Sequence, residues 1–357
     1  MNRIDVGIIG TGWCGGIRAG ACAAHPLVRN LHLAEIRPER LAEVARATGA
    51  RTATADYREL LAMEEISAII VSATPETTHY PMAREALAAG KHVFLEKPIA
   101  LELAEADELI AIARKSKLKF TIGYSQRFNP KYAYVKKCLE DGTIGKPVSA
   151  LVSRHITRNL GAKITGRIKL SPAAMESTHD LDFVLWCLEP AKPVRVYSQI
   201  NYGAMKAATG ADIPDCQWIT VTMDSGLSFV VGGGWSLPPG YPNFSTTWIE
   251  FLGTEGALLV DDSHKDVVLN TMGKGMMLPM STMPGEQVEH VFAGPMAAET
   301  VHFIEAVACD RAVLVTPEHA RMVMEVYLAA DLSAESGAPV GLPLAAARPA
   351  AAAGGRR

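Results

Sequence analysis

Short apolar runs alternate with amphipathic segments over the first third of the chain. The runs are rich in β-branched residues and carry few polar positions, which is typical of strands buried on both faces. The amphipathic segments between them are typical of helices that cover a parallel sheet. We therefore expect strands at residues 4–9, 31–35, 68–72, 92–95 and 120–123. Helices are expected to begin near Gly12, Pro38, Asp56, Thr78 and Glu102.

The pattern changes at a cluster of turn-forming residues, 141–147, which a helix over residues 130–141 is expected to precede. Beyond it, apolar runs follow one another with little helix between them, which indicates a largely antiparallel sheet. Its strands are expected at residues 148–155, 194–201, 218–223, 227–235, 246–252 and 257–261. The helices of this part are expected at residues 173–188, 297–309 and 317–336.

This organisation predicts an α/β protein of two domains. Residues 1–125, closed by the helix at about 130–141, are expected to form a doubly wound parallel sheet with its helices. Residues 145–344 are expected to form a second α/β domain. The last stretch, residues 345–357, contains only Ala, Gly, Pro and Arg without periodicity, and we expect a disordered tail because it has no apolar face to bury.

The composition narrows the class of protein. A chain of 357 residues with 48% hydrophobic content is long enough for two cores. The net charge of −3 and the pI near 6.4 provide no field that attracts nucleic acid or anionic lipid, so we expect neither as a partner. The six cysteines lack Cys-x-x-Cys spacing and are expected to be reduced thiols. Without a leader-like segment or an apolar run of membrane length, a cytoplasmic location is expected.

A glycine-rich turn follows the first predicted strand and opens a helix. Its sequence, Gly10-Thr-Gly12-Trp-Cys-Gly15, is Gly-x-Gly-x-x-Gly in the context that indicates dinucleotide binding. Gly10 permits the tight turn, Gly12 lets the backbone approach a pyrophosphate, and Gly15 lets helix and strand pack closely. Free amides at the start of the helix would hold the anion.

An acidic residue, Glu35, ends the second predicted strand. A carboxylate there accepts hydrogen bonds from the ribose hydroxyls and repels a 2′-phosphate, which favours NAD over NADP. Arg37 and Arg40 keep NADP open, because an arginine just past the strand can bind that phosphate. The alternative for both arginines is a solvated charge at a helix start. We expect NAD.

The tripeptide Glu96-Lys97-Pro98 follows the predicted strand at 92–95. Pro98 fixes its own φ and disfavours the helical conformation at Lys97, so the ammonium is expected to be held at the carboxyl end of the sheet. Ligands of doubly wound sheets bind at that edge. Thr74 and Pro75 follow another strand at the same edge and are expected on the nicotinamide-ribose side, with His79 either nearby or beginning a helix.

Five segments in this order resemble the Gfo/Idh/MocA oxidoreductases: the turn at 10–15, Thr74-Pro75 with His79, residues 90–98, residues 123–130, and His179-Asp-Leu-Asp182. The resemblance covers the chain to about residue 344. It implies a Rossmann domain followed by an α/β domain whose large open sheet forms a homodimer or homotetramer. It also implies NAD(P)-dependent hydride transfer at a secondary alcohol or ketone of a sugar, inositol, sugar acid or related cyclic polyol.

The resemblance carries residue roles with it. Lys97 and His179 correspond to the catalytic lysine and histidine and are expected to contact the substrate, together with Tyr124 and Asn129. Independently of the resemblance, Arg158 ends the first predicted strand of the second domain, where it is expected either to meet substrate hydroxyls or to be a solvated charge. Arg154 and His155 lie at the same strand end and are less favoured as substrate contacts. The expected cofactor contacts are Gly10, Thr11, Gly12, Trp13, Cys14, Gly15, Glu35, Ile36, Arg37, Thr74, Pro75, His79, Glu96, Lys97 and Arg127. Oxidation of an alcohol needs a proton acceptor. His179 is expected to be that base while Lys97 stabilises the oxygen, or Lys97 itself exchanges the proton.

One position departs from the inositol dehydrogenase pattern. Those members carry an aspartate four residues before the histidine, whereas this chain has Met175. Glu176 shares the helical face of His179, so we expect it to supply a displaced carboxylate that orients the histidine. No metal-ligand spacing is present, and no catalytic metal is expected.

Three alternative functions stay open at this stage. The first is a dehydrogenase of a non-sugar cyclic diol. The second is an enzyme that retains NAD and uses transient oxidation for elimination or glycoside cleavage. The third is a non-catalytic NAD-sensing regulator, which is disfavoured because a sensor needs neither Lys97 nor His179.

Overall fold

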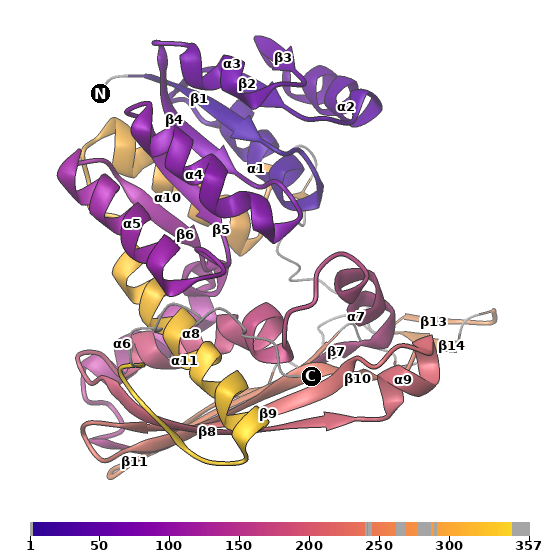
Figure 1. Cartoon of the computed structure of the whole chain (residues 1–357), viewed down its shortest axis with the longest axis vertical. Helices are drawn as coiled ribbons and strands as arrows, with labels where there is room; N and C mark the ends of the chain where they lie inside the picture. Colours follow the sequence, from indigo (N-terminus) through magenta and orange to yellow (C-terminus); the bar gives the residue numbers. More distant parts are fainter. Residues whose placement is uncertain are drawn as a thin grey trace, which may run out of the picture.

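The computed structural model describes residues 3–239, 241, 245–261, 269–273, 275–277, 287–288 and 291–344. They form two bodies, each built on one large sheet (Figure 1). The α/β fold class, with a parallel Rossmann sheet and a mostly antiparallel second sheet, is confirmed. The predicted tail at 345–357 lies outside the described residues.

The first sheet has six parallel strands in the order β3-β2-β1-β4-β5-β6. They are β1 (Ile4–Ile9), β2 (Val28–Ala34), β3 (Thr52–Thr54), β4 (Ile66–Val71), β5 (His92–Glu96) and β6 (Phe120–Gly123). The helices of this part are α1 (Trp13–Ala24), α2 (Pro38–Thr48), α3 (Tyr57–Ala62), the 3₁₀ turn η1 (Glu76–Thr78), α4 (His79–Ala88) and α5 (Leu103–Lys115). The strand order reverses between β1 and β4, and a doubly wound sheet binds its ligand at that point.

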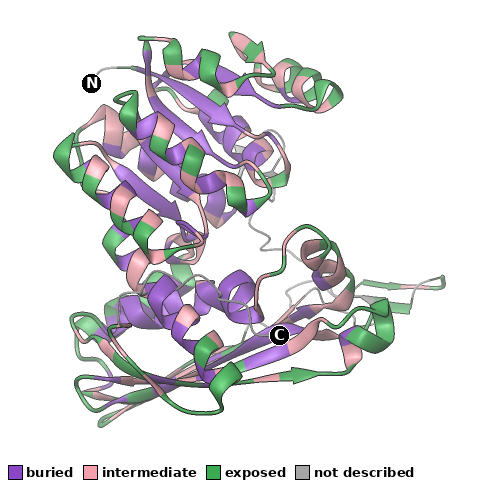
Figure 2. Cartoon of the chain, in the orientation of Figure 1, coloured by how far each residue is buried: buried purple, intermediate pink, exposed green. Residues whose placement is uncertain are grey.

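All five predicted strands of this sheet are present, and the periodicity missed only the short edge strand β3. The strands are apolar along their length because helices cover both faces, as the buried (purple) ribbon in Figure 2 shows. One covering helix comes from far along the chain. Helix α10 (Pro295–Ala308) lies against α1 and inserts Phe303 and Ile304 into the core formed by β1, β2 and β4. The first body therefore includes a helix that the sequence prediction placed in the second domain.

The second sheet has the order β12-β11-β7-β10-β9-β8-β17 and is antiparallel except between β7 and β10. Its strands are β7 (Pro147–Thr157), β8 (Pro193–Tyr202), β9 (Pro214–Met223), β10 (Ser228–Leu237), β11 (Ser245–Gly253), β12 (Ala257–Asp261) and β17 (Val340–Gly341). The short pairs are β13 (Leu269–Thr271) with β14 (Gly275–Met277), and β15 (Gln287–Val288) with β16 (Val291–Phe292).

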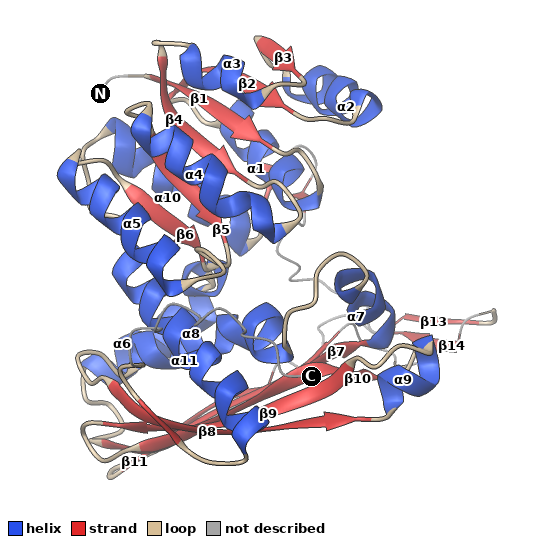
Figure 3. Ribbon diagram, viewed as in Figure 1, coloured by secondary structure: helices blue, strands red, loops and turns tan. Residues whose placement is uncertain are grey.

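Helices cover this sheet on the side that faces the first body, whereas the outer side is open (Figure 3). They are the 3₁₀ turn η2 (Ser125–Phe128), α6 (Pro130–Glu140), α7 (Arg158–Thr165), the π-helical turn η3 (Ala173–Ser177), α8 (Thr178–Cys187), α9 (Ala204–Thr209) and α11 (Pro317–Ser336). The sequence pattern missed α7, α9 and the π-helical turn. No helix in the described part of the chain has both the length and the apolar character needed to cross a membrane.

Candidate active site between the two bodies

The glycine-rich turn has the geometry that its sequence predicts. Gly10 has φ of +84°, and an added Cβ would lie 2.6 Å from Ala73 Cα. A Cβ at Gly15 would lie 1.9 Å from the Gly10 carbonyl oxygen, so only glycine lets α1 pack this closely on the turn. At Gly12, by contrast, the nearest atom to an added Cβ is Arg37 Nη2 at 3.9 Å. The space beside Gly12 is open, as a backbone that receives a pyrophosphate requires.

Glu35 lies just beyond β2, and its carboxylate faces this turn. The Thr11 amide donates to Glu35 Oε2 at 2.9 Å, and the Arg37 amide and Nε donate to Oε1 at 3.1 and 3.0 Å. Burial acts to raise the pKa of Glu35, but the hydrogen bonds from Arg37 and from the two backbone amides outweigh it and hold the pKa at about 2. Glu35 is therefore a fixed anion beside the turn, placed to accept ribose hydroxyls and to repel a phosphate.

Two large apolar side chains next to the turn are exposed to an unusual degree. Trp13, the first residue of α1, is 59% exposed, and Ile36, next to Glu35, is 80% exposed. Arg40 donates to the carbonyls of Thr11 and Gly12 at 2.7 and 3.1 Å, so it braces the turn and does not project freely. This combination fits a bound dinucleotide: amides for the pyrophosphate, a carboxylate for the ribose, and apolar surface for the base.

Lys97 reaches from the end of β5 into the second body. Its Nζ donates to the Met175 carbonyl at 2.5 Å and lies 3.5 Å from Met175 Sδ. The π-helical turn presents this carbonyl, since its wider hydrogen-bond register interrupts the α-helical pattern. Burial lowers the pKa of Lys97, Glu176 and Glu76 act against that shift, and Arg154 adds to it. Met175, which stands where inositol dehydrogenases carry an aspartate, therefore contacts Lys97 directly.

His179 lies one turn beyond Met175, at the start of α8. Its ring stands edge-on to the Tyr124 ring at a centroid distance of 5.9 Å, and the Tyr124 hydroxyl is 2.9 Å from Thr178 Oγ1. Burial and the charges of Lys97 and Arg154 hold the pKa of His179 well below its ordinary value. His179 is thus a neutral imidazole, and within the described residues its buried Nδ1 has no hydrogen-bond partner. A neutral ring can accept a proton.

Glu176 has different partners from those expected. Its carboxylate lies 3.6 Å from Arg154 Nη1 through Oε2 and accepts from Trp235 Nε1 at 3.4 Å through Oε1. The expected contact between Glu176 and His179 is not present among the described residues, because the π-helical turn changes the angular spacing that a regular helix would give. Arg154, which the sequence argument rated below Arg158, is the residue at the centre of this cluster.

Behind Lys97, the Glu96 carboxylate points into a buried cluster and away from the expected cofactor position. Arg18 of α1 donates to Glu96 Oε1 at 2.6 Å and to Glu299 Oε2 of α10 at 2.8 Å, and it stacks on Phe94 with Cζ 4.0 Å from the ring centroid. Burial and the nearby Glu96 raise the pKa of Glu299 to about 8 despite Arg18. No local pattern indicates the pairing of Arg18 with Glu299, because the two residues are 281 positions apart in the chain.

His79 is a structural link between two loops at the sheet edge. Its Nδ1 lies 2.9 Å from the Pro98 carbonyl and its Nε2 lies 3.1 Å from the Ala73 carbonyl. The buried ring therefore joins the segment after β4 to the segment after Lys97, and burial lowers its pKa. Thr74 and Pro75 are exposed at the same edge. His79 thus holds together the two loops beside the expected cofactor position. Both of its ring nitrogens contact backbone carbonyls, so neither is free to bind the cofactor.

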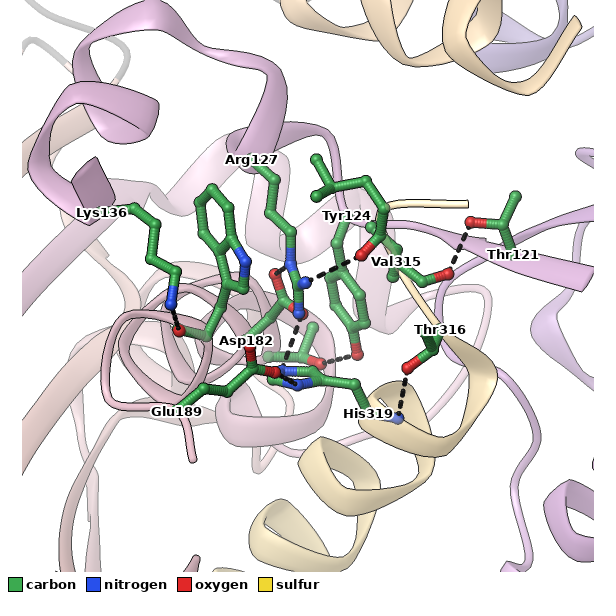
Figure 4. A network of polar contacts seen from close by, with 12 residues as sticks. Thr121, Tyr124, Arg127, Lys136, Asp182, Glu189, Val315, Thr316 and His319 are labelled. Carbon is green, nitrogen blue, oxygen red and sulfur yellow. Dashed lines mark hydrogen bonds and ion pairs between the residues drawn. The ribbon is translucent and has the colours of Figure 1, made fainter. Parts of the chain in front are cut away.

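Arg127 belongs to a buried polar network and not to the cofactor surface (Figure 4). Its guanidinium makes a bidentate pair with Asp182 at 2.9 and 2.7 Å and donates to the Leu314 carbonyl at 3.3 Å. His319 of α11 lies on the other side of Asp182 and contacts Glu189 at 3.0 Å. Arg127 is only 3% exposed, so it does not fit the expected contact with the cofactor.

Two further residues expected to contact the substrate, Asn129 and Arg158, each make a hydrogen bond to the backbone. The Asn129 side chain accepts from the Lys131 amide and caps α6, which accounts for its polar group. Arg158 begins α7, and its Nε donates to the Ser236 carbonyl at 3.2 Å.

In the described part of the chain, no group of three His, Cys, Asp or Glu side chains is arranged to hold a metal ion.

Comparisons with known proteins agree with this geometry. A family model described as an oxidoreductase family with an NAD-binding Rossmann fold matches residues 4–124, and a model for the C-terminal alpha/beta domain of that oxidoreductase family matches residues 136–342. Among curated proteins, scyllo-inositol 2-dehydrogenase (NAD(+)) of Bacillus subtilis is 29% identical over 306 residues, 85% of each chain. Inositol 2-dehydrogenase of Rhizobium meliloti is 26% identical over 278 residues, 77% of this chain and 81% of the relative.

A solved structure of scyllo-inositol dehydrogenase from Lactobacillus casei, with bound NAD(H) and scyllo-inositol, superposes with a TM-score of 0.82 at 21% identity. The match covers 95% of this chain and 99% of the other. At that level of identity the likeness concerns the fold.

Proposed function

The chain belongs to the oxidoreductase family that joins an NAD-binding Rossmann fold to a C-terminal α/β domain, and from this membership we propose that it oxidises a secondary alcohol of a cyclic polyol. The chain is an NAD-binding oxidoreductase of the inositol and sugar dehydrogenase type. The proposed substrate is an inositol, sugar, sugar acid or related ring. The relatives named above act on inositols, which supports this choice.

The observation that carries the proposal is the contact of Lys97 with the Met175 carbonyl, one turn before His179. Two groups that can exchange protons, one from each body, thereby meet at the carboxyl edge of the Rossmann sheet. When bound, a nicotinamide cofactor would supply the hydride acceptor, and ligands of such sheets bind at that edge. The protein has to position the hydroxyl and take its proton.

In the proposed mechanism, neutral His179 accepts the hydroxyl proton through its ring nitrogen. Lys97 donates a hydrogen bond to the same oxygen and stabilises the negative charge that develops there. To do so, the ammonium exchanges the Met175 carbonyl for the substrate oxygen, and the lowered pKa of Lys97 also lets it take part in the proton transfer. Tyr124 packs edge-on against His179 and fixes its ring. We propose Arg158, at the head of α7, as a substrate contact.

The test is a screen of inositols, sugars and sugar acids at 340 nm with NAD and with NADP. Wild type is expected to form NADH with at least one of them and to prefer NAD. Lys97→Ala is expected to lose about a hundredfold or more of kcat, which is the scale of general acid–base catalysis. Lys137→Ala, an exposed lysine of α6, serves as the matched control. Equal activity of Lys97→Ala and wild type would overturn the mechanism.

We further propose that the open face of the second sheet joins two copies of the chain. Trp218 pairs with Gly232, which pairs with Ser153 and then Trp248, so one row of outward positions carries two indole rings. Trp218 and Trp248 are 36% and 38% exposed, and Tyr197 on β8 is 42% exposed. An apolar face of this kind is typical of a protein interface. Light scattering should give a dimer or tetramer, and a monomeric mass would contradict the proposal.

The six cysteines are free thiols, and we propose the cytoplasm as the compartment that keeps them reduced.

A further inference from the structure

A buried arginine lies directly behind the proposed proton-transfer pair. Arg154 projects from β7 toward the helices, and its Nε donates to both carboxylate oxygens of Asp180, at 3.1 and 2.9 Å. Its Nη2 donates to the Glu176 carbonyl, and its Nη1 lies 3.6 Å from Glu176 Oε2. Asp180 is 1% exposed and also faces Gln126 Nε2 at 3.4 Å. One guanidinium therefore contacts both the π-helical turn and the first turn of α8.

The π-helical turn is held by two cations from opposite bodies. Lys97 binds the carbonyl of Met175, and Arg154 binds the carbonyl of the next residue, Glu176. A π-helical turn departs from the regular α-helical hydrogen-bond register, and here two side-chain donors from outside the helix bind its carbonyls. His179 follows two residues after this turn ends. Its position relative to Lys97 depends on the conformation that Arg154 holds.

We propose that Arg154 is a positioning residue for the Lys97–His179 pair, an inference that rests on the proposed function. The guanidinium fixes the π-helical turn through Glu176 and fixes α8 through Asp180. It also changes the electrostatics of the site. Met175 stands where inositol dehydrogenases carry an aspartate, so the site lacks that anion beside Lys97. Arg154 adds a cation, which favours the neutral, proton-accepting forms of Lys97 and His179.

The charges around the pair are consistent with this role. Lys97 faces Glu176, Glu76 and the Cys14 thiol as well as Arg154, and the cation acts against the two carboxylates. His179 faces the cations Lys97 and Arg154. Burial and both of these charges lower the pKa of His179. Without Arg154, Glu176 and Glu76 would favour the protonated form of Lys97 unopposed, and His179 would lose one of the two cations that disfavour its protonation.

The test compares Arg154→Lys with Arg154→Gln. Arg154→Lys keeps the positive charge but loses the planar guanidinium that donates to Asp180 and Glu176 together, and Arg154→Gln loses both the charge and the guanidinium. Both variants are expected to lose about a hundredfold in kcat, the scale of a misplaced catalytic group. Only Arg154→Gln should move the acid limb of the kcat/KM profile to higher pH. Arg154→Gly should regain activity with millimolar guanidinium, which replaces the missing fork. Arg311→Met, which breaks a single surface ion pair, is the control.

A second readout does not depend on turnover. Competitive acetylation, resolved for each lysine by mass spectrometry, measures the pH at which Lys97 becomes a free amine, with exposed Lys137 as the internal reference. That pH should rise in Arg154→Gln and stay at the wild-type value in Arg154→Lys. Absence of this shift in a folded Arg154→Gln, or a wild-type pH profile and kcat, would overturn the role of Arg154. Lack of any polyol oxidation by wild type would instead overturn the proposed function alone.

Discussion

Met175→Asp is expected to move the pH dependence of the enzyme to higher pH. The new carboxylate would lie where Met175 Sδ now lies, 3.5 Å from Lys97 Nζ. At this separation two unit charges attract by about 5 kcal/mol at an effective dielectric constant of about 20. Desolvation of the new carboxylate offsets several kcal/mol of that attraction. The remainder favours the ammonium form, so the pKa of Lys97 rises and its proton-accepting form appears only at higher pH.

The assay is kcat/KM against pH, with NAD and the best polyol of the screen. The acid limb of this profile reports the free-enzyme pKa of the base that must be deprotonated. Met175→Asn has a side chain of similar size without the charge and should leave the limb in place. Competitive acetylation of Lys97 in both variants assigns any shift to this residue. If Met175→Asp and Met175→Asn gave the same limb, Lys97 would not be a proton-exchanging group next to position 175.

Three further predictions concern the turn, the buried network and the cluster behind Lys97. Gly12→Ala should keep the wild-type melting temperature but bind NAD at least about tenfold more weakly. Gly15→Ala should also lower the melting temperature, because the Cβ added at position 15 collides with the turn and the one at position 12 does not. Equal melting curves for the two variants would refute this explanation. Arg127→Met should lower the free energy of unfolding in urea by about 3–5 kcal/mol, since it removes the guanidinium that pairs with the buried Asp182 carboxylate. Adding Asp182→Leu should recover part of the loss, and no recovery would contradict the pairing. Glu299 binds its proton more tightly in the folded chain, so wild-type stability should fall as pH rises between its ordinary pKa of 4.5 and about 8. Glu299→Gln should lose that slope, and an unchanged slope would assign it to another group.

The sequence predicted the nucleotide-binding body closely because its signals are local. A strand, a glycine turn and a helix start lie within a dozen residues, and the collision distances at Gly10 and Gly15 confirm why those positions need glycine. Lys97 was identified in the same way, from a strand and a proline beside it. The family assignment, the fold class and NAD as cofactor are all confirmed.

The second body was predicted less completely because its polar contacts join segments far apart in the chain. The interpretation of Glu176 assumed a regular helix, and the π-helical turn directs its carboxylate to Arg154 and Trp235 instead. Arg127 stood in a family motif, yet its partner Asp182 is 55 residues away. A signal for Arg154 was present, since residues 142–175 contain six Lys or Arg and no acidic residue. Such a stretch can pair only with acids elsewhere, and two of them are Glu176 and Asp180.

Isotope labelling tests whether the enzyme transfers hydride from a carbinol carbon to the nicotinamide. The best polyol of the screen, carrying deuterium at the carbon that is oxidised, would be incubated with the enzyme and NAD, and the nicotinamide product analysed by mass spectrometry. The reduced cofactor is expected to carry the deuterium, and Lys97→Ala is expected to form it at least about a hundredfold more slowly. Turnover of the labelled polyol without any deuterium in free reduced cofactor would contradict hydride transfer to NAD as the reaction of this enzyme.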